Sequence, residues 1–259
     1  MKVTVLILII LSIVTILTTG FWDEVSNFVF PNLTWGLYDK DFFENVLVEM
    51  HGGIIDLLIV GVILYGFDIR RTKKDSIENA RNDLADLKYY FGSDASFKFY
   101  RALRRLASLE VHNVEIPNGS LSNLKIKSLS LSKSNLVAVD FSRSSLDNVT
   151  LQKCDLQAAQ FIDSKLRHCT FENLNLERSK FIKADLKGMN FESCIIEGAI
   201  FKDSNLQSAI FKNVDCRGVS FKGCNLRSAS FRGAKNLTKD MIEEAADYRF
   251  VKYPERADD

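Results

Sequence analysis

The chain has 259 residues, of which 46% are hydrophobic and 26% are charged, and its 34 basic and 33 acidic side chains give a formal net charge of +1. This composition suits a protein that folds and excludes a disordered polyelectrolyte. The charge is unevenly distributed, because residues 1–67 carry 2 basic and 7 acidic side chains (−5), 68–118 carry 10 and 8 (+2), 119–235 carry 18 and 11 (+7), and 236–259 carry 4 and 7 (−3). We therefore consider these four segments as separate parts of the molecule.

The N-terminal segment is almost unbrokenly apolar from Val3 to Leu17, and Phe21 and Trp22 follow it as aromatic residues suited to a membrane interface. Only one lysine precedes this run, and the small-residue cleavage site near Gly20 is weak. We therefore interpret the run as an uncleaved membrane anchor, with a secretory signal peptide as the alternative.

A second apolar stretch extends from Val46 to Phe67, and the basic sequence Asp-Ile-Arg-Arg-Thr-Lys-Lys follows it at 68–74. The loop at 23–45 between the two stretches is acidic, with Lys40 as its single basic residue. The positive-inside rule places the basic cluster in the cytoplasm and the loop outside. The prediction for residues 1–67 is two transmembrane helices in a bacterial inner membrane, with both termini of the protein in the cytoplasm.

Two acidic residues interrupt the second apolar stretch. Glu49 lies near its outer end, whereas Asp56 lies near its middle, where a carboxylate is costly in lipid unless it faces protein or water. One interpretation is that Asp56 is protonated or hydrogen-bonded to the polar side of the first span, which carries Thr4, Ser12, Thr15 and Thr19. The other is that Glu49 and Asp56 form a polar membrane face that lines the axis of a helix bundle.

The second interpretation rests on a stripe in steps of three and four residues. From Glu49 and Asp56 the stripe continues into an apolar heptad pattern at Ile77, Ala80, Leu84, Leu87 and Phe91. In one continuous helix both parts would lie on the same side, so Ile77, Leu84 and Leu87 are predicted to form the seam of a homo-oligomer. Against this, only about two heptads are apolar, and a kink at Gly52-Gly53 or Gly66 would break the phase.

Residues 68–118 are predicted to form a helical linker and an N-terminal cap. Gly92 ends the first helix, and Ser93 or Asp94 caps a second helix over roughly 95–107. The apolar side of this second helix is expected to cover the start of the next domain, with Phe97, Tyr100, Leu103 and Leu106 facing inward and Lys98, Arg101 and Arg105 on the other side.

The segment at 119–235 has a period of five residues. Every fifth residue from Leu121 to Phe231 is large and apolar, with Cys216 as the only smaller one, and small residues such as Ala159 recur two positions earlier. A period of five is neither the 3.6 of a helix nor the 2 of a strand, so this segment is a repeat architecture. Small residues beside large ones indicate that both point toward a narrow axis.

These repeats resemble the pentapeptide-repeat family, whose motif is Ala-(Asp/Asn)-Leu-x-x. The resemblance is carried by Cys-Asp-Leu-Gln-Ala at 154–158, Ala-Asp-Leu-Lys-Gly at 184–188, Ser-Asn-Leu-Gln-Ser at 204–208 and Cys-Asn-Leu-Arg-Ser at 224–228. It implies a cytosolic all-β solenoid, a right-handed quadrilateral β-helix in which four pentapeptides make one coil of twenty residues. In that geometry Phe residues line two opposite faces and stack between coils.

The segment at 236–259 resembles the capping helix that often closes such proteins. Thr238 is the predicted N-cap, and Met241, Ile242 and Ala245 face inward. Such a cap prevents strand addition at an open coil edge. The last residues, ending in Asp259, are expected to form a loose tail.

No group of residues predicts an enzyme, a metal site or a cofactor. The three histidines are isolated, no phosphate-binding glycine loop is present, and the cysteines lack any CxxC element. All five cysteines occupy inward repeat positions, which predicts free buried thiols and a reducing compartment. Carboxylates such as Asp155, Asp185 and Asp215 precede the central repeat residue, where they are expected to bond neighbouring turns.

Residues twenty apart lie one above another on a face of the predicted β-helix. Arg143, Asp163, Lys183 and Asp203 alternate in sign and would neutralise one another. Three other series do not alternate, and they are the candidate anion-binding ladders: Arg167, Lys187 and Arg227; Lys202 and Lys222; Lys212 and Arg232. Their partner would be an oligonucleotide, another nucleic acid, a lipid headgroup or an anionic protein; the alternative is a solvated basic surface. The net charge of +7 argues against DNA mimicry, which some acidic members of the family perform.

The sequence is consistent with two functions. The first is an oligomeric inner-membrane effector that forms a pore or ion channel, gated by a ligand on the cytosolic rod, in a layout similar to that of several bacterial antiphage effectors. The second is a membrane-tethered scaffold for protein interaction without channel activity. Asp56 favours the first, and the short heptad pattern favours the second.

Overall fold

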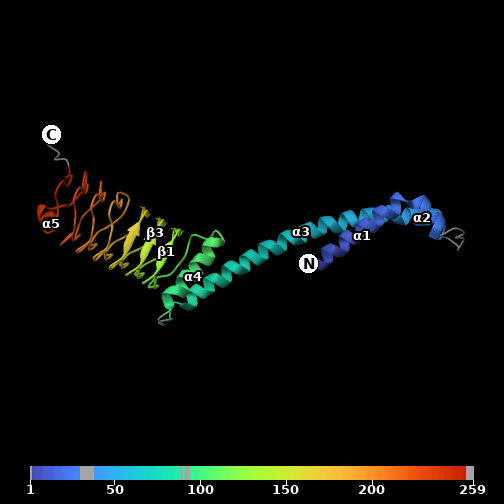
Figure 1. Cartoon of the computed structure of the whole chain (residues 1–259), viewed down its shortest axis with the longest axis horizontal. Coiled ribbons are helices and arrows are strands. Elements are labelled where there is room, and N and C mark those ends of the chain that lie inside the picture. Colours follow the sequence, from blue (N-terminus) through green and yellow to red (C-terminus); the bar gives the residue numbers. More distant parts are fainter. Residues whose placement is uncertain (1, 30–37, 88–89, 91–93, 255–259) are drawn as a thin grey trace. The chain divides into compact units, whose positions relative to one another are not determined.

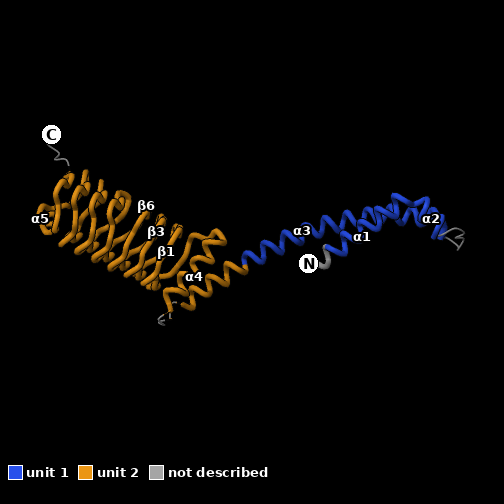
Figure 2. Tube along the Cα trace, viewed as in Figure 1, with its two compact units in different colours: residues 1–74 blue, residues 75–259 orange. Residues whose placement is uncertain are grey.

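A computed structural model describes residues 2–29, 38–87, 90 and 94–254. The chain divides into two compact units, residues 1–74 and 75–259 (Figure 2). The first unit is helical, and the second contains the β-helix with helical segments at both of its ends (Figure 1). The boundary between the units falls within the helix Lys40–Leu87. The four segments expected from the charge distribution therefore belong to two compact units.

The first unit contains helices α1 (Lys2–Gly20), α2 (Trp22–Val29) and the first part of α3 (Lys40–Leu87). α1 and α2 are separated by a bend of 88°. The Trp22 indole Nε1 donates a hydrogen bond of 2.7 Å to Glu44 Oε1, and Lys40 Nζ lies 3.8 Å from Asp23 Oδ1, so α2 is tied to the start of α3.

α3 is long and apolar enough to cross a membrane, and its most apolar part is not covered by the rest of the described chain. The bent pair formed by α1 and α2 is a second candidate if it counts as one span. The predicted stretch from Val46 to Phe67 lies within α3, which runs without interruption past Gly52, Gly53 and Gly66. One or two helices of the chain therefore have the length and composition of a membrane span.

The second unit begins with the end of α3 and with α4 (Ala95–Ser108), which cover the N-terminal end of the β-helix (Figure 1). The predicted cap is confirmed, but the prediction for Phe97 is wrong, because its side chain is 68% exposed and Phe99 is buried instead. Phe97 and Leu106 are nine residues apart, which at 3.6 residues per turn places them on opposite sides of the helix. The buried stripe consists of Ala95, Phe99, Ala102, Leu103 and Leu106.

Asp94 is the N-cap residue of α4, although its side chain makes no capping hydrogen bond. Its carboxylate instead accepts a hydrogen bond of 2.5 Å from the Tyr90 hydroxyl and lies 3.2 Å from Lys98 Nζ. These two contacts lower the pKa of Asp94, the Tyr90 hydrogen bond having the larger effect. The predictions for Phe91, Gly92 and Ser93 lie outside the described residues.

The predicted oligomer seam is occupied within a single chain. Leu84 is 4% exposed and belongs to the same hydrophobic core as Leu103 of α4, and the partly buried Ile77 and Leu87 pack against that core. The heptad pattern is therefore explained by the packing of this part of α3 in its own unit. A seam between chains at these positions has no further support in the structure.

The β-helix has coils of twenty residues. Strands on successive coils pair in parallel, each residue opposite the one twenty positions later, as Leu146 pairs with Leu166. One sheet consists of β1 (Lys125–Lys127), β3 (Ser145–Asp147) and β5 (Lys165–Arg167). The other consists of β2 (Ser130–Ser132), β4 (Thr150–Gln152) and β6 (Thr170–Glu172). Isolated bridges continue the same register to Asp215 and Lys235. The predicted β-solenoid is confirmed, with one pentapeptide on each of four faces.

The core follows the five-residue period. All 23 predicted central residues from Leu121 to Phe231 are buried, none more than 5% exposed. The rings of Phe161 and Phe181 stack at a centroid distance of 4.7 Å, and Phe191 and Phe211 stack at 5.0 Å on the opposite face. Phe171 is the exception, because it meets Phe191 edge to face at 6.1 Å. Two stacked columns of Phe therefore lie on opposite faces of the solenoid, as the family resemblance implies.

Small inward residues join the coils by hydrogen bonds as well as by packing. The buried Ser144 hydroxyl donates to the Leu121 carbonyl at 2.7 Å and accepts from the Leu124 amide at 2.9 Å, one coil earlier. The corners are formed by residues two positions after each central residue, from Asn123 (φ 57°) to Gly233 (φ 66°), in the left-handed conformation that type II turns require. Ser193 departs from this pattern, and its hydroxyl accepts a hydrogen bond of 2.9 Å from the Asn173 amide.

The C-terminal end is closed by α5 (Lys239–Glu243). Thr238 is its N-cap and accepts a hydrogen bond of 3.3 Å from the Met241 amide, as predicted, and Ile242 is buried. The chain then rejoins the solenoid, because the Leu226 amide donates to the Asp247 carbonyl at 2.6 Å and the Phe231 amide donates to the Lys252 carbonyl at 2.7 Å. The β-helix therefore extends beyond its predicted end at residue 235. The last residues, 255–259, lie outside the described part.

Candidate functional site

The register determines which outward side chains share a face of the β-helix. Each pentapeptide has two inward residues, one large and one small, and three outward residues. Each outward position recurs every twenty residues, on the next coil. Adjacent coils are spaced like paired strands, about 4.8 Å apart. Charged groups in one series therefore lie close enough to interact directly.

One face, which we call the basic face, has six basic and two acidic outward side chains. Its inward residues run from Ile126 to Leu226 in steps of twenty. The basic residues are Lys125, Lys127, Lys165, Arg167, Lys187 and Arg227, and the acidic ones are Asp147 and Asp185.

The predicted ladder of Arg167, Lys187 and Arg227 lies on the basic face, with all three side chains exposed. Arg167 and Lys187 are on adjacent coils, whereas Gln207 separates Lys187 from Arg227. On this face His168 Nδ1 lies at hydrogen-bonding distance, 3.0 Å, from Asp147 Oδ1, and within the described chain no ion pair joins any of the three ladder residues. His168, with smaller effects of Lys127 and Arg167, lowers the pKa of Asp147. The sequence prediction did not include Lys125, Lys127 and Lys165, which the same twenty-residue spacing identifies.

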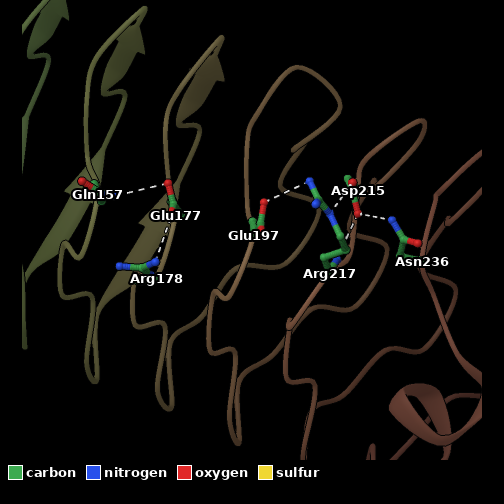
Figure 3. Close-up of polar contacts among 7 residues, drawn as sticks. All are labelled: Gln157, Glu177, Arg178, Glu197, Asp215, Arg217 and Asn236. Atoms are coloured by element: carbon green, nitrogen blue, oxygen red, sulfur yellow. Dashed lines mark hydrogen bonds and ion pairs between the residues drawn. The ribbon is translucent and has the colours of Figure 1, made fainter.

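The opposite face, ten residues away along each coil, holds several ion pairs, and we call it the ion-paired face. Arg217 lies 3.1 Å from Glu197 Oε2 and 2.9 Å from Asp215 Oδ2, and Asn236 donates to Asp215 at 2.7 Å (Figure 3). On the two preceding coils, Gln157 donates to Glu177 at 3.2 Å (Figure 3). Three basic and five acidic residues make up its charges: Arg178, Arg217, Lys235, Glu115, Asp155, Glu177, Glu197 and Asp215.

The two other predicted ladders lie on the two remaining faces and differ from each other. Lys202 and Lys222 are exposed on adjacent coils, and neither forms an ion pair with any described residue. Lys212, in contrast, lies 3.2 Å from Glu192 Oε1, one coil earlier in the same series. The interpretation of Lys212 and Arg232 as an unneutralised ladder is therefore wrong for Lys212, because Glu192 was left out of the series.

Acidic repeat residues make local structural contacts. Asp155 Oδ1 accepts a hydrogen bond of 3.1 Å from the Gln157 amide two residues later, and Asp185 Oδ1 accepts one of 3.0 Å from the Asn205 side chain on the next coil. These contacts confirm the predicted bonding to neighbouring turns. Among the described residues no group of three His, Cys, Asp or Glu side chains could hold a metal ion. The absence of an enzymatic activity stays a prediction.

The five cysteines are free, and four of them are buried. Burial raises the pKa of Cys194 to about 11 and those of Cys216 and Cys224 to about 12. Cys169, partly exposed, also has a raised pKa because of burial. Thiols with such high pKa values are almost entirely protonated near neutral pH and are poor nucleophiles.

The predicted polar membrane face is open on the surface of α3. Glu49 and Asp56 are both exposed within the described chain. The hydroxyls of Ser12, Thr15 and Thr19 donate to carbonyls of their own helix four residues earlier, at 2.8–2.9 Å. None of these three hydroxyls donates to Asp56. The interpretation in which they hold Asp56 therefore loses its support, and the side chain of Thr4 lies outside the described part.

Family models match the repeats at residues 110–181, described as a pentapeptide repeat region, and at residues 199–235, described as pentapeptide repeats in eight copies. The repeat segment of the chain matches the pentapeptide-repeat family. The matched residues coincide with the coils described above, and they begin at the irregular first coil, where Ile116 is already buried.

Solved pentapeptide-repeat structures are similar to part of this chain. Rfr23 from the cyanobacterium Cyanothece 51142 is 19% identical over 58% of this chain and 96% of its own, with a TM-score of 0.25. A thylakoid-lumen protein from Arabidopsis thaliana is 20% identical over 47% and 74%, with a TM-score of 0.20. QnrB1, a plasmid-mediated fluoroquinolone resistance protein, is 16% identical over 54% and 82%, with a TM-score of 0.26. No curated protein sequence matches the chain.

Proposed function

We propose that this protein is a membrane-tethered binding platform whose pentapeptide-repeat β-helix holds an anionic partner on its basic face. The observation that carries the proposal is the difference between two opposite faces of one rod. Six basic and two acidic side chains lie on the basic face, whereas the acidic groups of the ion-paired face are matched by Arg217 and polar neighbours. Unpaired cations at strand spacing repel one another, and an anionic partner relieves that repulsion.

The tether is formed by α3 and by the α1–α2 pair. Their length and composition support membrane insertion, and the basic residues at 70–74 with the acidic loop at 23–45 support a two-pass arrangement with both termini in the cytoplasm. In this arrangement the β-helix lies in the cytoplasm of a bacterial cell, in the same compartment as soluble acidic proteins and nucleic acids.

Matched charge variants test the platform. In the full-length protein in detergent, the triple variant Arg167→Gln, Lys187→Gln, Arg227→Gln is compared with Lys133→Gln, Lys153→Gln, Lys183→Gln, which removes the same three charges from other faces. Fluorescence anisotropy with labelled polyglutamate should show binding weakened about 10- to 100-fold in the first variant and much less in the second. Equal weakening in both variants would mean that only net charge matters, and would contradict a specific face.

A channel is the second candidate, and the exposure of Asp56 favours it. Within the described residues no hydrogen bond satisfies this carboxylate, and in a bilayer such a group faces water or another protein surface. A homo-oligomer whose copies meet at Glu49 and Asp56 provides that environment without using Leu84. Measurement of ion flux in proteoliposomes separates the two functions. A channel predicts flux in the wild type that Asp56→Asn alters, whereas a tether predicts vesicles that stay tight with either protein.

A further inference from the structure

The C-terminal end of the basic face carries exposed aromatic side chains. Because the Ser228 amide donates to the Arg249 carbonyl at 2.9 Å, Arg249 follows Arg227 in the ladder and Phe250 follows Ser228. The Arg227 guanidinium lies 5.8 Å from the centre of the Phe250 ring. The series of Arg167, Lys187 and Arg227 therefore leads directly to an aromatic ring.

Three aromatic residues surround a hollow at this end. Tyr248, Phe250 and Tyr253 are 44%, 71% and 50% exposed, and they line a pocket of about 520 Å³ together with Asp247 and Arg249. A cluster of exposed aromatic rings is typical of a surface that contacts a ligand or partner. Asp247 holds the Arg249 guanidinium at 2.7 Å, whereas Arg227 and, further along, Lys187 form no ion pair with any described residue.

A row of cations that ends in exposed aromatic rings fits one class of polyanion best. Single-stranded nucleic acids have phosphates that follow a cationic groove and unstacked bases that stack on aromatic side chains. An acidic polypeptide would use the cations but has no need of the rings, and a duplex keeps its bases stacked on one another. From Arg167 to Arg249 the ladder takes four coil steps, about 19 Å, which is enough for a strand a few nucleotides long.

We propose that the basic face binds single-stranded oligonucleotide, with phosphates on Lys187 and Arg227 and a base stacked on Phe250. This proposal rests on the proposed platform function and specifies its ligand. The rings of Tyr248 and Tyr253 border the same pocket and offer further stacking surfaces. The proposal requires no contact from α3 or from the membrane helices.

The test uses the full-length protein in detergent with a labelled 12-nucleotide single-stranded DNA of mixed sequence, and with labelled polyglutamate as the second anion. Phe250→Ala should weaken oligonucleotide binding about 5- to 100-fold and leave polyglutamate binding unchanged. Lys187→Gln should weaken the binding of both anions. Phe97→Ala, which removes an exposed ring at the other end of the β-helix, should change neither. The thermal unfolding temperature of each variant shows whether its fold is intact.

Two results would overturn the proposal in different ways. If Phe250→Ala binds the oligonucleotide as tightly as the wild type while Lys187→Gln weakens binding of both anions, the basic face is a general anion platform and the stacking site is refuted. If the wild type binds neither anion, the platform itself fails and this inference fails with it. A wild type that prefers polyglutamate to the oligonucleotide would also contradict the proposal, and would indicate an acidic protein as the partner.

Discussion

At the scale of single residues, the five-residue period predicted the core and the alternation of Phe. The prediction placed Phe97 inward, although helical periodicity favours Phe99, which is seven residues from Leu106 and shares its side of the helix. Charge pairing was also incompletely predicted. Lys212 was interpreted as unpaired, although Glu192 lies one coil earlier in the same series. Inward positions follow from periodicity alone, whereas ion pairs require every member of a series to be considered.

Phe201 tests the packing of the core. It is fully buried and stacks on Phe181 at a centroid distance of 4.9 Å, so Phe201→Ala should open a cavity and lower the free energy of unfolding by about 3–5 kcal/mol. Lys202→Ala is the matched control, because its side chain is exposed and should contribute almost nothing. Denaturant unfolding of both variants measures the difference. Equal losses would mean that the assignment of inward and outward positions is incorrect.

Thiol reactivity tests the burial and the raised pKa values of the cysteines. Only the thiolate is alkylated, and a pKa of about 12 for Cys216 and Cys224 leaves about one thiol in ten thousand ionised at pH 8. In the native protein iodoacetamide should therefore label the partly exposed Cys169 first, and Cys216 and Cys224 should react only after unfolding. Mass spectrometry of the labelled peptides gives the order. Rapid native labelling of Cys216 would contradict its position in the core.

At the scale of elements, the sequence predicted the cap helices but not the return of the chain to the solenoid. α5 interrupts the repeat, so that Tyr248 follows Leu226 by 22 residues and the five-residue phase is lost. The heptad pattern of α3 was read as a seam between chains because periodicity shows that a face is buried and does not show what covers it. In the structure α4 and the rest of the N-terminal core account for that burial.

Truncation after Lys235 tests the role of the C-terminal element. Removal of the following residues leaves the amides of Leu226 and Phe231 without the carbonyls of Asp247 and Lys252, and exposes the edge of the last coil. An open edge of this kind pairs with other chains. The truncated protein should therefore form larger aggregates in size-exclusion chromatography. Thr238→Ala, which removes only the α5 N-cap, should cost about 1 kcal/mol without causing aggregation. A truncated protein that remains as dispersed as the wild type would show that the cap does not protect this edge.

At the scale of the whole molecule, the proposed function rests on two properties that lie in different units. The first unit supplies helices of membrane-span length and composition, and the second supplies a β-helix with unequal faces. The sequence predicted both, since apolar length and twenty-residue spacing are local properties. The sequence does not predict the aromatic end of the basic face, because that end forms only when Asp247 and Lys252 pair with the last coil.

Co-flotation with proteoliposomes tests the central claim most directly, because it requires the tether and the basic face in one molecule. Full-length protein reconstituted into neutral lipid vesicles is mixed with labelled polyglutamate and centrifuged through a density gradient. The wild type should carry the label to the top of the gradient, the triple variant at Arg167, Lys187 and Arg227 should float without it, and the control triple at Lys133, Lys153 and Lys183 should retain it. A wild-type protein that floats without the label, or a protein that remains at the bottom without the vesicles, would contradict a membrane-tethered anion-binding platform.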